Sequence, residues 1–265
     1  MTTIIITGAS DGIGAEIAQQ LAKQWGPSVN LVLAARRIEK LRDVEAVCQN
    51  HGAHTLLVPT DVANKVQCKQ LIDETVRCFG GIDTLINNAG ISAHALLDEV
   101  RFDDLEWYES VMRINLWGSV WCTHAALPFL KQSRGRVVAV SSLAGLVGVP
   151  GRTAYSASKF AMTGFFEALR AEVVGLGVSV TIAYPGVVDT RIRYNGLNAQ
   201  GEKAGVSGLK EDHAMPVATC AALIIEGMQK RQRNVVMTAK GKVGQWLKLL
   251  APALVERMAQ AALKP

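Results

Sequence analysis

A tyrosine and a lysine four residues apart, Tyr155 and Lys159, are the side chains whose types and spacing could do chemistry. On a helix, residues at positions i and i+4 emerge from one face, one turn apart. A free tyrosine has a pKa of about 10, and a nearby lysine ammonium would lower that pKa toward the working range. Upstream, Ser142 could hydrogen-bond the oxygen of an alcohol or carbonyl. These residues predict proton transfer at a substrate oxygen; the alternative is a surface Tyr–Lys pair on an amphipathic helix.

A glycine-rich turn follows the first expected strand, where segment 7–14 reads Thr-Gly-Ala-Ser-Asp-Gly-Ile-Gly. Gly8 would permit the turn, Gly12 would let the backbone approach a pyrophosphate, and Gly14 would allow close packing of helix on strand. The N-terminus of the following helix would offer free N–H groups and the positive end of its dipole to phosphates. This placement between a strand and a helix predicts a dinucleotide site.

The second expected strand ends at Ala35, where an acidic residue would bind the ribose 2′-hydroxyl and reject a 2′-phosphate. Instead Arg36 and Arg37 follow, and guanidinium groups suit a phosphate and the adenine ring. The sequence therefore predicts NADP(H) in preference to NAD(H). The alternative is that both arginines are solvated turn residues.

The segments that must position these residues alternate between β-branched runs and amphipathic stretches. Strands are expected over 3–7, 30–35, 54–59, 83–86, 136–140, 179–184 and 234–236. Helices are expected over 13–24, 39–49, 65–79, 104–130, 154–174 and 217–230. Apolar strands separated by helices predict an α/β fold, a Rossmann-type doubly wound parallel sheet of about seven strands in a single domain.

Two segments near the C-terminus depart from this alternation. The glycine-rich polar loop 195–213 follows the sixth strand, so it is expected to be a substrate lid within a domain spanning 1–240. The tail 241–265 repeats apolar residues on a helical period, and Pro252 should kink or divide it.

The tail has two alternative roles. It could pack against the body or a partner subunit, or it could contact a membrane surface through Trp246 and its leucines, with Lys242 and Lys248 at the headgroups.

Composition excludes several classes of function. The net charge is +5 over 265 residues, and Lys and Arg form no polybasic block, so no nucleic-acid partner is predicted. The five cysteines lack C-x-x-C spacing and predict free thiols in a reducing compartment, hence a cytoplasmic protein. The N-terminal segment begins as a strand without a signal-peptide pattern, and no apolar run is long enough to span a bilayer. No cluster of His, Cys and carboxylates has ligand spacing, so no metal is predicted.

With these residues in view, the chain resembles the short-chain dehydrogenase/reductase family over almost its whole length. The signatures that carry the resemblance are T-G-x-x-x-G-x-G at 7–14, Asn87-Asn88-Ala89-Gly90, Asn115, Ser142, Y-x-x-x-K at 155–159, and Pro185-Gly186. The resemblance implies hydride transfer between a nicotinamide and a carbonyl carbon. It implies that Tyr155 exchanges a proton with the substrate oxygen that Ser142 holds, while Lys159 lowers the pKa of Tyr155 and Asn115 anchors a water-linked relay.

The same resemblance implies a set of cofactor-binding residues. Asp61 and Val62 would contact the adenine, Lys159 would also bind the nicotinamide ribose, and Thr190 would bind the carboxamide. The implied set is Gly8, Ser10, Asp11, Gly12, Ile13, Gly14, Arg36, Arg37, Asp61, Val62, Asn88, Ala89, Gly90, Tyr155, Lys159, Pro185, Gly186, Val188 and Thr190. Asp11 departs from the pattern, because many NADP-dependent relatives carry a basic residue there, which leaves NAD(H) as the alternative cofactor.

The substrate wall is expected from 92–97, 143–152, Val187 and the 195–213 loop. Its apolar members Leu143, Leu146, Val147, Val149 and Leu197 predict a hydrophobic ketone, aldehyde or alcohol. His94 could line this wall or be an ordinary loop histidine.

Segment 145–159 and the following Gly164-Phe165-Phe166 look most similar to the steroid- and retinoid-type branch of the family. The alternatives are a β-ketoacyl thioester reductase and a dinucleotide-binding regulator without catalysis. Apolar outer positions of the helices expected at 104–130 and 154–174 could form a subunit interface, and the family resemblance implies a homodimer or homotetramer built on these helices. Those outer positions are Trp117, Trp121, Phe165 and Phe166.

Overall fold

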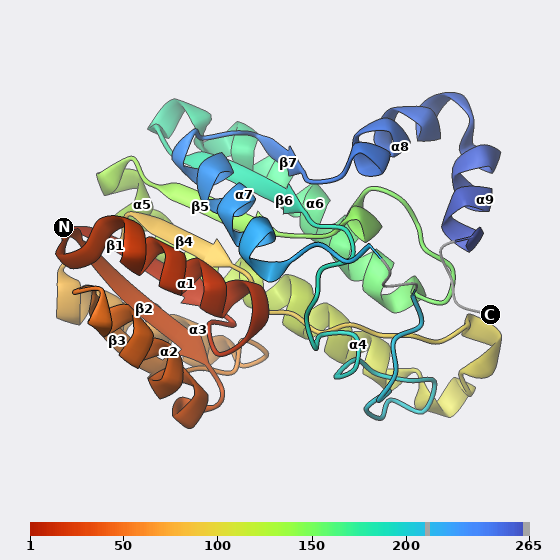
Figure 1. Ribbon diagram of the computed structural model, residues 1–265, viewed down its shortest axis with the longest axis horizontal. Helices are drawn as coiled ribbons and strands as arrows, with labels where there is room; N and C mark the ends of the chain where they lie inside the picture. Colours follow the sequence, from red (N-terminus) through yellow and green to blue (C-terminus); the bar gives the residue numbers. More distant parts are fainter. Residues whose placement is uncertain (210–212, 262–265) are drawn as a thin grey trace.

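The computed structural model of the protein describes residues 1–209 and 213–261 (Figure 1). Seven strands form one parallel sheet in the order β3-β2-β1-β4-β5-β6-β7. They are β1 (Thr2–Thr7), β2 (Val29–Ala35), β3 (His54–Pro59), β4 (Thr84–Asn87), β5 (Arg136–Val140), β6 (Ser179–Tyr184) and β7 (Asn234–Val236). Each strand lies within one residue of its expected ends; β1, β2, β4, β5 and β6 are buried almost throughout, whereas β3 and β7 at the sheet edges are only partly buried.

Helices cover both faces of this sheet and create two apolar layers. One layer packs α1 (Gly12–Trp25), α2 (Ile38–Asn50) and α7 (Val217–Gln229) against one face. The other packs α3 (Lys65–Phe79), α5 (Gly118–Ser133) and α6 (Thr153–Val173) against the opposite face. Short 3-10 turns lie at Gly26–Ser28, Leu97–Glu99, Phe102–Asp104, Leu143–Gly145 and Val174–Leu176. This is the expected Rossmann-type doubly wound fold.

The helix expected over 104–130 is present as a continuous helical run over 106–133, with one irregularity that the sequence did not predict. The run consists of α4 (Glu106–Met112) and α5, which continue into each other through a π turn over Arg113–Trp117. A π turn is a local widening of the helix that often occurs at functional sites. Here the turn contains Asn115, whose side chain bonds across to the chain segment after β4.

The order in which the strands are added to the sheet reverses at β1, because β2 lies on one side of β1 and β4 on the other. In such a sheet the crevice beyond the carboxyl ends of the strands accepts ligands. Thr7 holds the two neighbouring strands together at this point, since its hydroxyl accepts hydrogen bonds from the N–H groups of Asn88 and Ala89 at 3.0 and 3.1 Å. The fold therefore opens a crevice where the glycine-rich turn begins.

The tail forms two helices, α8 (Ala239–Leu250) and α9 (Pro252–Ala261), so the expected division at Pro252 is confirmed. Residues 262–265 of the expected tail and 210–212 of the expected lid lie outside the described residues. The division of the chain into a 1–240 domain and a 241–265 tail stays a prediction. Within residues 1–209 and 213–261, every helix is too short or too polar to cross a bilayer.

One residue of the expected subunit interface is placed wrongly. Phe166 is fully buried in the layer between α6 and the sheet, because its position on α6 points inward with Met162 and Leu169. Trp117 is 48% exposed and stacks on Trp121 with ring centroids 6.0 Å apart, so an outward apolar face is present there.

Candidate active site

A cavity of about 480 Å³ occupies the crevice at the carboxyl ends of the strands. All the residues expected to bind the cofactor or to act in catalysis line this cavity, except Gly14 and Asn115. The cavity runs from Arg36 after β2, past the glycine-rich turn, to Ser142 after β5 and Tyr155 on α6. The fold thus brings together residues that are far apart in the sequence, and their individual roles stay predictions.

The glycine-rich turn has the shape that its residues predict. Gly8 and Gly12 have φ values of +68° and +54°, which only glycine adopts readily. A Cβ atom on Gly14 would lie 2.4 Å from the carbonyl oxygen of Gly8 and 2.5 Å from Nδ2 of Asn88. Gly14 is therefore absent from the cavity wall because it packs α1 directly against the turn.

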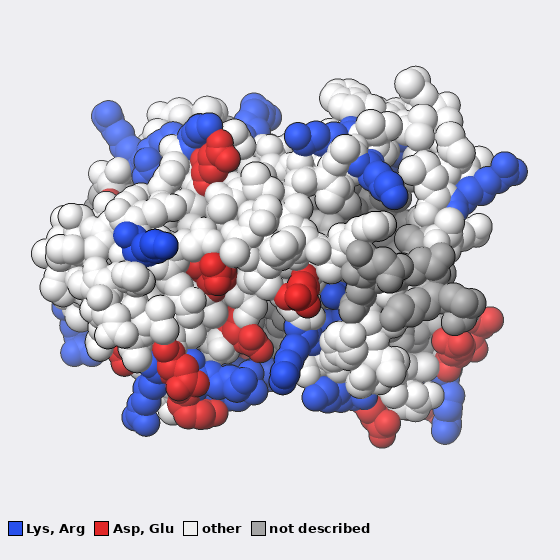
Figure 2. Space-filling view, viewed as in Figure 1, with Lys and Arg blue, Asp and Glu red and all other residues white. Residues whose placement is uncertain are grey.

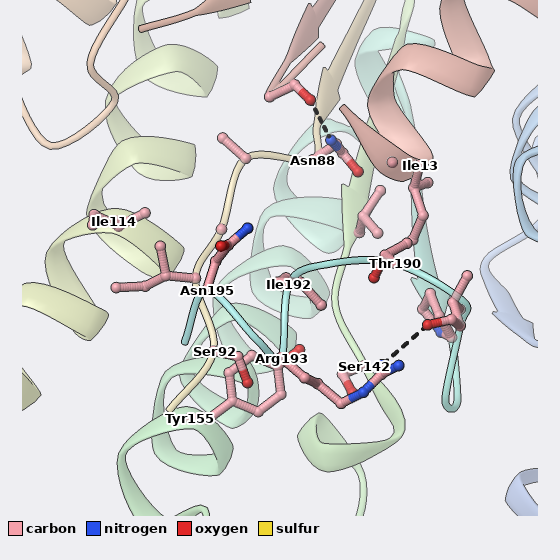
Figure 3. A pocket seen from close by; sticks show the side chains of 18 of the residues that line it. Ile13, Asn88, Ser92, Ile114, Ser142, Tyr155, Thr190, Ile192, Arg193 and Asn195 are labelled. Carbon is pink, nitrogen blue, oxygen red and sulfur yellow. Dashed lines mark hydrogen bonds between the residues drawn. The ribbon is translucent and has the colours of Figure 1, made fainter. Parts of the chain in front are cut away.

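The start of α1 and the segment after β4 form one wall of the cavity. Asp11 caps α1, and its carboxylate accepts a hydrogen bond from the N–H of Gly12 over 2.8 Å. The Asn88 amide donates to the carbonyl oxygens of Thr7 and Gly8 at 3.0 and 3.3 Å (Figure 3). A tight turn with glycines at positions 8 and 12, at a helix N-terminus, fits the pyrophosphate of a dinucleotide.

The end of the cavity away from Ser142 and Tyr155 holds Arg36 and Arg37. Both arginines are exposed and directly follow the buried Ala35. No acidic residue stands at the end of β2. Asp61 lies at the end of β3, where its carboxylate accepts a hydrogen bond from the N–H of Ala63 over 3.0 Å.

Tyr155 and Lys159 lie on the same face of α6 and are both buried. The Nζ atom of Lys159 is 5.8 Å from the centroid of the Tyr155 ring and donates to the carbonyl oxygen of Val140 over 2.9 Å. Burial lowers the pKa of Lys159 to about 8. Burial also raises the pKa of Tyr155, and this effect is opposed by Arg152, by a hydrogen bond with Ser142 and by Arg193.

Ser142 follows β5 and points toward Tyr155 in the cavity (Figure 3). It caps a short turn, in which its Oγ accepts from the N–H of Ala144 over 3.2 Å. Ser141 is turned away, since its hydroxyl donates to the carbonyl oxygen of Lys159 over 3.3 Å. Only Ser142 of this pair presents its hydroxyl to the cavity side of Tyr155.

Asn115 lies behind the cavity and is completely buried. Its Oδ1 accepts from the N–H of Ile91 over 2.8 Å, and its Nδ2 donates to the carbonyl oxygen of Ile91 and to Oγ of Ser158. The Ser158 hydroxyl in turn donates to the carbonyl oxygen of Tyr155 over 2.8 Å. Asn115 thus fastens the helix that carries Tyr155 to the wall after β4.

The expected apolar substrate wall is partly wrong. Leu146, Val147 and Leu197 do not line the cavity. Leu146 packs against the core beside α6, Val147 closes the turn after Leu143, and Leu197 pairs with Ala93 in a separate apolar cluster. The expected wall residues that do line the cavity are Ser92, Leu143, Ala144, Val149, Arg152, Val187, Asn195 and Leu209.

Two buried arginines also line this part of the cavity, and no sequence motif marks either one. Arg152 lay within the expected wall but was assigned no role, and Arg193 was not expected at the site. Arg193 donates to the carbonyl oxygen of Val188 over 3.0 Å and to Oγ of Ser207 over 3.2 Å. Ala259 of α9 also reaches the cavity.

His94 is not part of the cavity wall but lies behind Arg152. Its pKa is lowered to about 4, chiefly by burial and then by Arg152.

Over residues 1–209 and 213–261, His, Cys, Asp and Glu form no group that could hold a metal ion.

Comparison with known proteins agrees with this geometry. Residues 2–200 match the family described as "short chain dehydrogenase". A protein of Sesamum indicum named "11-beta-hydroxysteroid dehydrogenase A" is 34% identical over 259 residues, which cover 96% of this chain and 73% of that protein. The "11-beta-hydroxysteroid dehydrogenase 1A" of Arabidopsis thaliana is 34% identical over 260 residues, with the same coverage of both chains.

Two solved structures share the fold. A short-chain dehydrogenase/reductase from Burkholderia phymatum in complex with NAD has a TM-score of 0.81 at 24% identity, and the match covers 96% of this chain and 94% of that one. An alcohol dehydrogenase from Thermococcus sibiricus, complexed with 5-hydroxy-NADP, has a TM-score of 0.75 at 22% identity, covering 89% and 96%.

Proposed function

Because this chain belongs to the short-chain dehydrogenase family and is therefore an oxidoreductase of CH–OH or C=O groups, we propose that it uses NADP(H) to interconvert a hydrophobic ketone or aldehyde with its alcohol. The observation that carries this proposal is one cavity that holds the glycine-rich turn at one end and Ser142, Tyr155 and Lys159 at the other.

In the proposed mechanism the chain's own residues position the substrate oxygen and exchange one proton with it. The bound nicotinamide cofactor supplies or accepts the hydride. Ser142 donates a hydrogen bond to the carbonyl oxygen, and the Tyr155 hydroxyl gives that oxygen its proton during reduction. The raised pKa of Tyr155 keeps its hydroxyl protonated near neutrality, as a proton donor requires.

Lys159 and Asn115 have supporting roles in this proposal. Lys159 would bind the nicotinamide ribose and, when protonated, would favour the phenolate that Tyr155 becomes after giving up its proton. Asn115 would hold the water-linked relay that returns the proton. Its described contacts, to Ile91 and Ser158, support a positioning role behind Tyr155.

A screen of NADPH oxidation tests this proposal. Ketosteroids, retinal, aliphatic and aromatic ketones and acyl thioesters would be offered to the protein, with the Tyr155→Phe variant as the control. Turnover of a hydrophobic carbonyl that disappears in the variant supports the proposal. Turnover confined to thioesters would favour a β-ketoacyl thioester reductase, and cofactor binding without any turnover would favour a non-catalytic regulator.

The preference for NADP(H) is supported by the two arginines at the end of β2 and is tested by replacing one of them. We expect a lower KM for NADPH than for NADH. Arg36→Ala should narrow this gap, because a charge-assisted hydrogen bond to the 2′-phosphate would be lost. Exposed Arg77→Ala, on α3, is the matched control and should leave the gap unchanged. An equal or lower KM for NADH in the unaltered protein would contradict the preference.

Family members are commonly oligomeric, and we propose a homodimer or homotetramer formed by the helices on the α5–α6 side. The exposed Trp117 and the stacked Trp121 support an apolar contact there. Gel filtration at micromolar concentration tests the state, and a monomer would contradict it.

The tail supports a proposal of peripheral membrane contact. Much of the apolar side of α8 is uncovered: Val243, Trp246, Leu249 and Leu250 are all exposed. The helix carries three lysines and no acidic residue, and basic side chains appear over the α8 region in Figure 2. An exposed tryptophan and leucines beside lysines suit an anionic lipid surface.

One expected detail of the tail is changed. Lys248 is exposed, but its Nζ donates to the carbonyl oxygen of Leu146 over 3.1 Å and lies 4.6 Å from the centroid of the Phe160 ring. Lys240 and Lys242 are therefore the better candidates for lipid headgroups. We also propose a cytoplasmic location, which the free state of the five cysteines supports because free thiols persist in a reducing compartment.

A further inference from the structure

Arg152 is a buried cation beside the residue proposed to exchange the proton. Only 8% of its surface is exposed, and it lines the cavity. It is the N-cap residue of α6, three residues before Tyr155. Its Cζ atom is 5.2 Å from the centroid of the Tyr155 ring. The guanidinium is thus held against the face of that ring.

The contacts that hold Arg152 are all with uncharged groups. One of its Nη atoms donates to Oγ of Ser92 over 3.0 Å, and its Nε donates to Nδ1 of His94 over 3.2 Å. His94 is neutral near physiological pH because its pKa is lowered to about 4. Among residues 1–209 and 213–261, no carboxylate forms an ion pair with Arg152, and its Nη1 forms no hydrogen bond.

An uncompensated guanidinium in this position is unfavourable by itself. Removing a charge from water costs several kcal/mol unless a partner of opposite charge or a full set of hydrogen bonds compensates. The pKa of Arg152 is lowered to about 10, chiefly by burial; Tyr155 opposes this shift, and Arg193 adds to it. Because Arg152 lines the cavity without a carboxylate partner among the described residues, an anion bound beside it would supply the missing opposite charge.

We propose that the substrate carries a carboxylate, which Arg152 binds while the substrate carbonyl faces Ser142 and Tyr155. This inference rests on the proposed function and narrows its substrate class to hydrophobic oxo acids and the matching hydroxy acids. The planar guanidinium offers a hydrogen-bonding edge that suits a carboxylate. Its contact with the Tyr155 ring fixes the anion close to the reacting oxygen. The apolar Leu143, Val149 and Val187 would contact the rest of the molecule.

A purely structural Arg152 is the competing explanation. Its bonds to Ser92 and His94 tie the segment after β4 to the start of α6, and Ala95 bonds to the carbonyl oxygen of Gly151 beside them. A structural arginine would affect all substrates alike when replaced. A substrate-binding arginine would change the preference for an acid over its ester.

The test compares acids with esters of the same skeleton. NADPH oxidation would be measured with β-benzoylpropionate, γ-benzoylbutyrate and their methyl esters, using the unaltered protein, Arg152→Met and Arg152→Lys. Arg77→Met is the matched control, because it removes one exposed positive charge on α3, far from the cavity lining. Melting temperature and NADPH affinity would confirm that each variant is folded, and the Lys variant serves if the Met variant is not.

We expect kcat/KM of the unaltered protein to favour an acid over its ester by about tenfold or more, chiefly through KM. In Arg152→Met the preference should disappear, in Arg152→Lys it should be reduced, and in Arg77→Met it should remain. Equal turnover of acid and ester, or an equal loss of both in Arg152→Met, would overturn the inference.

The outcomes separate this inference from the proposed function. If esters are reduced in a Tyr155-dependent manner without any preference for acids, the function stands and the inference fails. If neither acids nor esters are reduced, the melting temperature of the NADPH-loaded protein decides. Stabilisation by the acids alone that is lost in Arg152→Met supports the anion site, and no stabilisation overturns it.

Discussion

Burial opposes the charged form of both ionisable residues of the proposed active site. It raises the pKa of Tyr155 and lowers that of Lys159 to about 8. A protonated phenol is the form that carbonyl reduction needs, whereas oxidation of an alcohol needs the phenolate. At the residue scale, the raised pKa of Tyr155 supports its proposed role as a proton donor in carbonyl reduction.

The first prediction concerns the proton of Tyr155. Tyr155→Phe keeps the ring and its contact with Arg152 but removes the hydroxyl, so kcat/KM should fall by about a hundredfold to ten-thousandfold. Steady-state kinetics measures this loss, and a binding titration should show retained NADPH affinity. Tyr108→Phe is the control, because Tyr108 bonds to Thr153 away from the cavity. Substantial residual turnover in Tyr155→Phe would contradict the proton-transfer role.

The second prediction follows from the buried ammonium of Lys159. Its pKa is about 8 in the folded chain against an ordinary value of 10.5, so between these values the unfolded chain binds more protons. The free energy of unfolding should therefore rise with pH across this window, by up to about 3 kcal/mol from this residue. In Lys159→Met that share of the rise should be absent.

Urea denaturation at the two ends of this pH window measures the effect. Lys23→Met, on the exposed side of α1, is the control and should keep the rise seen in the unaltered protein. An unchanged pH dependence in Lys159→Met would show that the ammonium is not destabilised by burial.

At the scale of single elements, the contact between α1 and the turn after β1 is the tightest point of the cofactor end. Gly14→Ala would place a Cβ atom against the Gly8 carbonyl and the Asn88 amide, so the backbone must shift. We expect a loss of about 1–3 kcal/mol in unfolding free energy together with weaker NADPH binding. Chemical denaturation and a binding titration measure the two effects.

Gly81→Ala is the matched control for this prediction, because no atom lies within 4 Å of the added Cβ and the residue lies outside the cavity wall. Both its stability and its NADPH affinity should stay close to those of the unaltered protein. If Gly14→Ala bound NADPH with normal affinity, the glycine-rich turn would tolerate a shift of its backbone, and the prediction would be wrong.

At the scale of the whole molecule, α8 and α9 extend from the sheet and reach back to the cavity through Ala259 (Figure 1). A membrane contact through α8 would therefore lie on the same helical extension that borders the substrate site. We expect the protein to float with liposomes that contain phosphatidylserine, and less so at high salt, because part of the attraction is electrostatic.

The double variant Trp246→Ser, Leu250→Ser should lose most of this flotation, because Trp246 exposes 67% of its surface and Leu250 exposes 86%. Phe102→Ser is the control, because Phe102 is equally exposed but lies in a different turn. No lipid association by the full-length chain would contradict membrane contact. A change in elution volume of the double variant on gel filtration would instead assign α8 to a subunit interface.

The sequence alone determined the sheet and the cofactor end of the site. The strands are apolar β-branched runs, the glycine-rich turn joins neighbouring elements, and Tyr155 and Lys159 share a helix face by their spacing. Such features depend on residues that are close in the chain. Their local preferences are enough to place them within the fold, and topology then brings the strand ends to one edge.

Only the tertiary structure decided the composition of the substrate half and the course of the helix around Asn115. Leu146 and Leu197 turn away from the cavity, Phe166 enters the core, and Arg152 enters the cavity beside Tyr155. The periodicity of apolar residues indicates the faces of a helix, but it does not determine which face meets a segment distant in sequence, and a loop has no such periodicity. That choice results from packing between β4, α6 and the loop after β6, and it placed an arginine where the sequence had predicted an apolar wall.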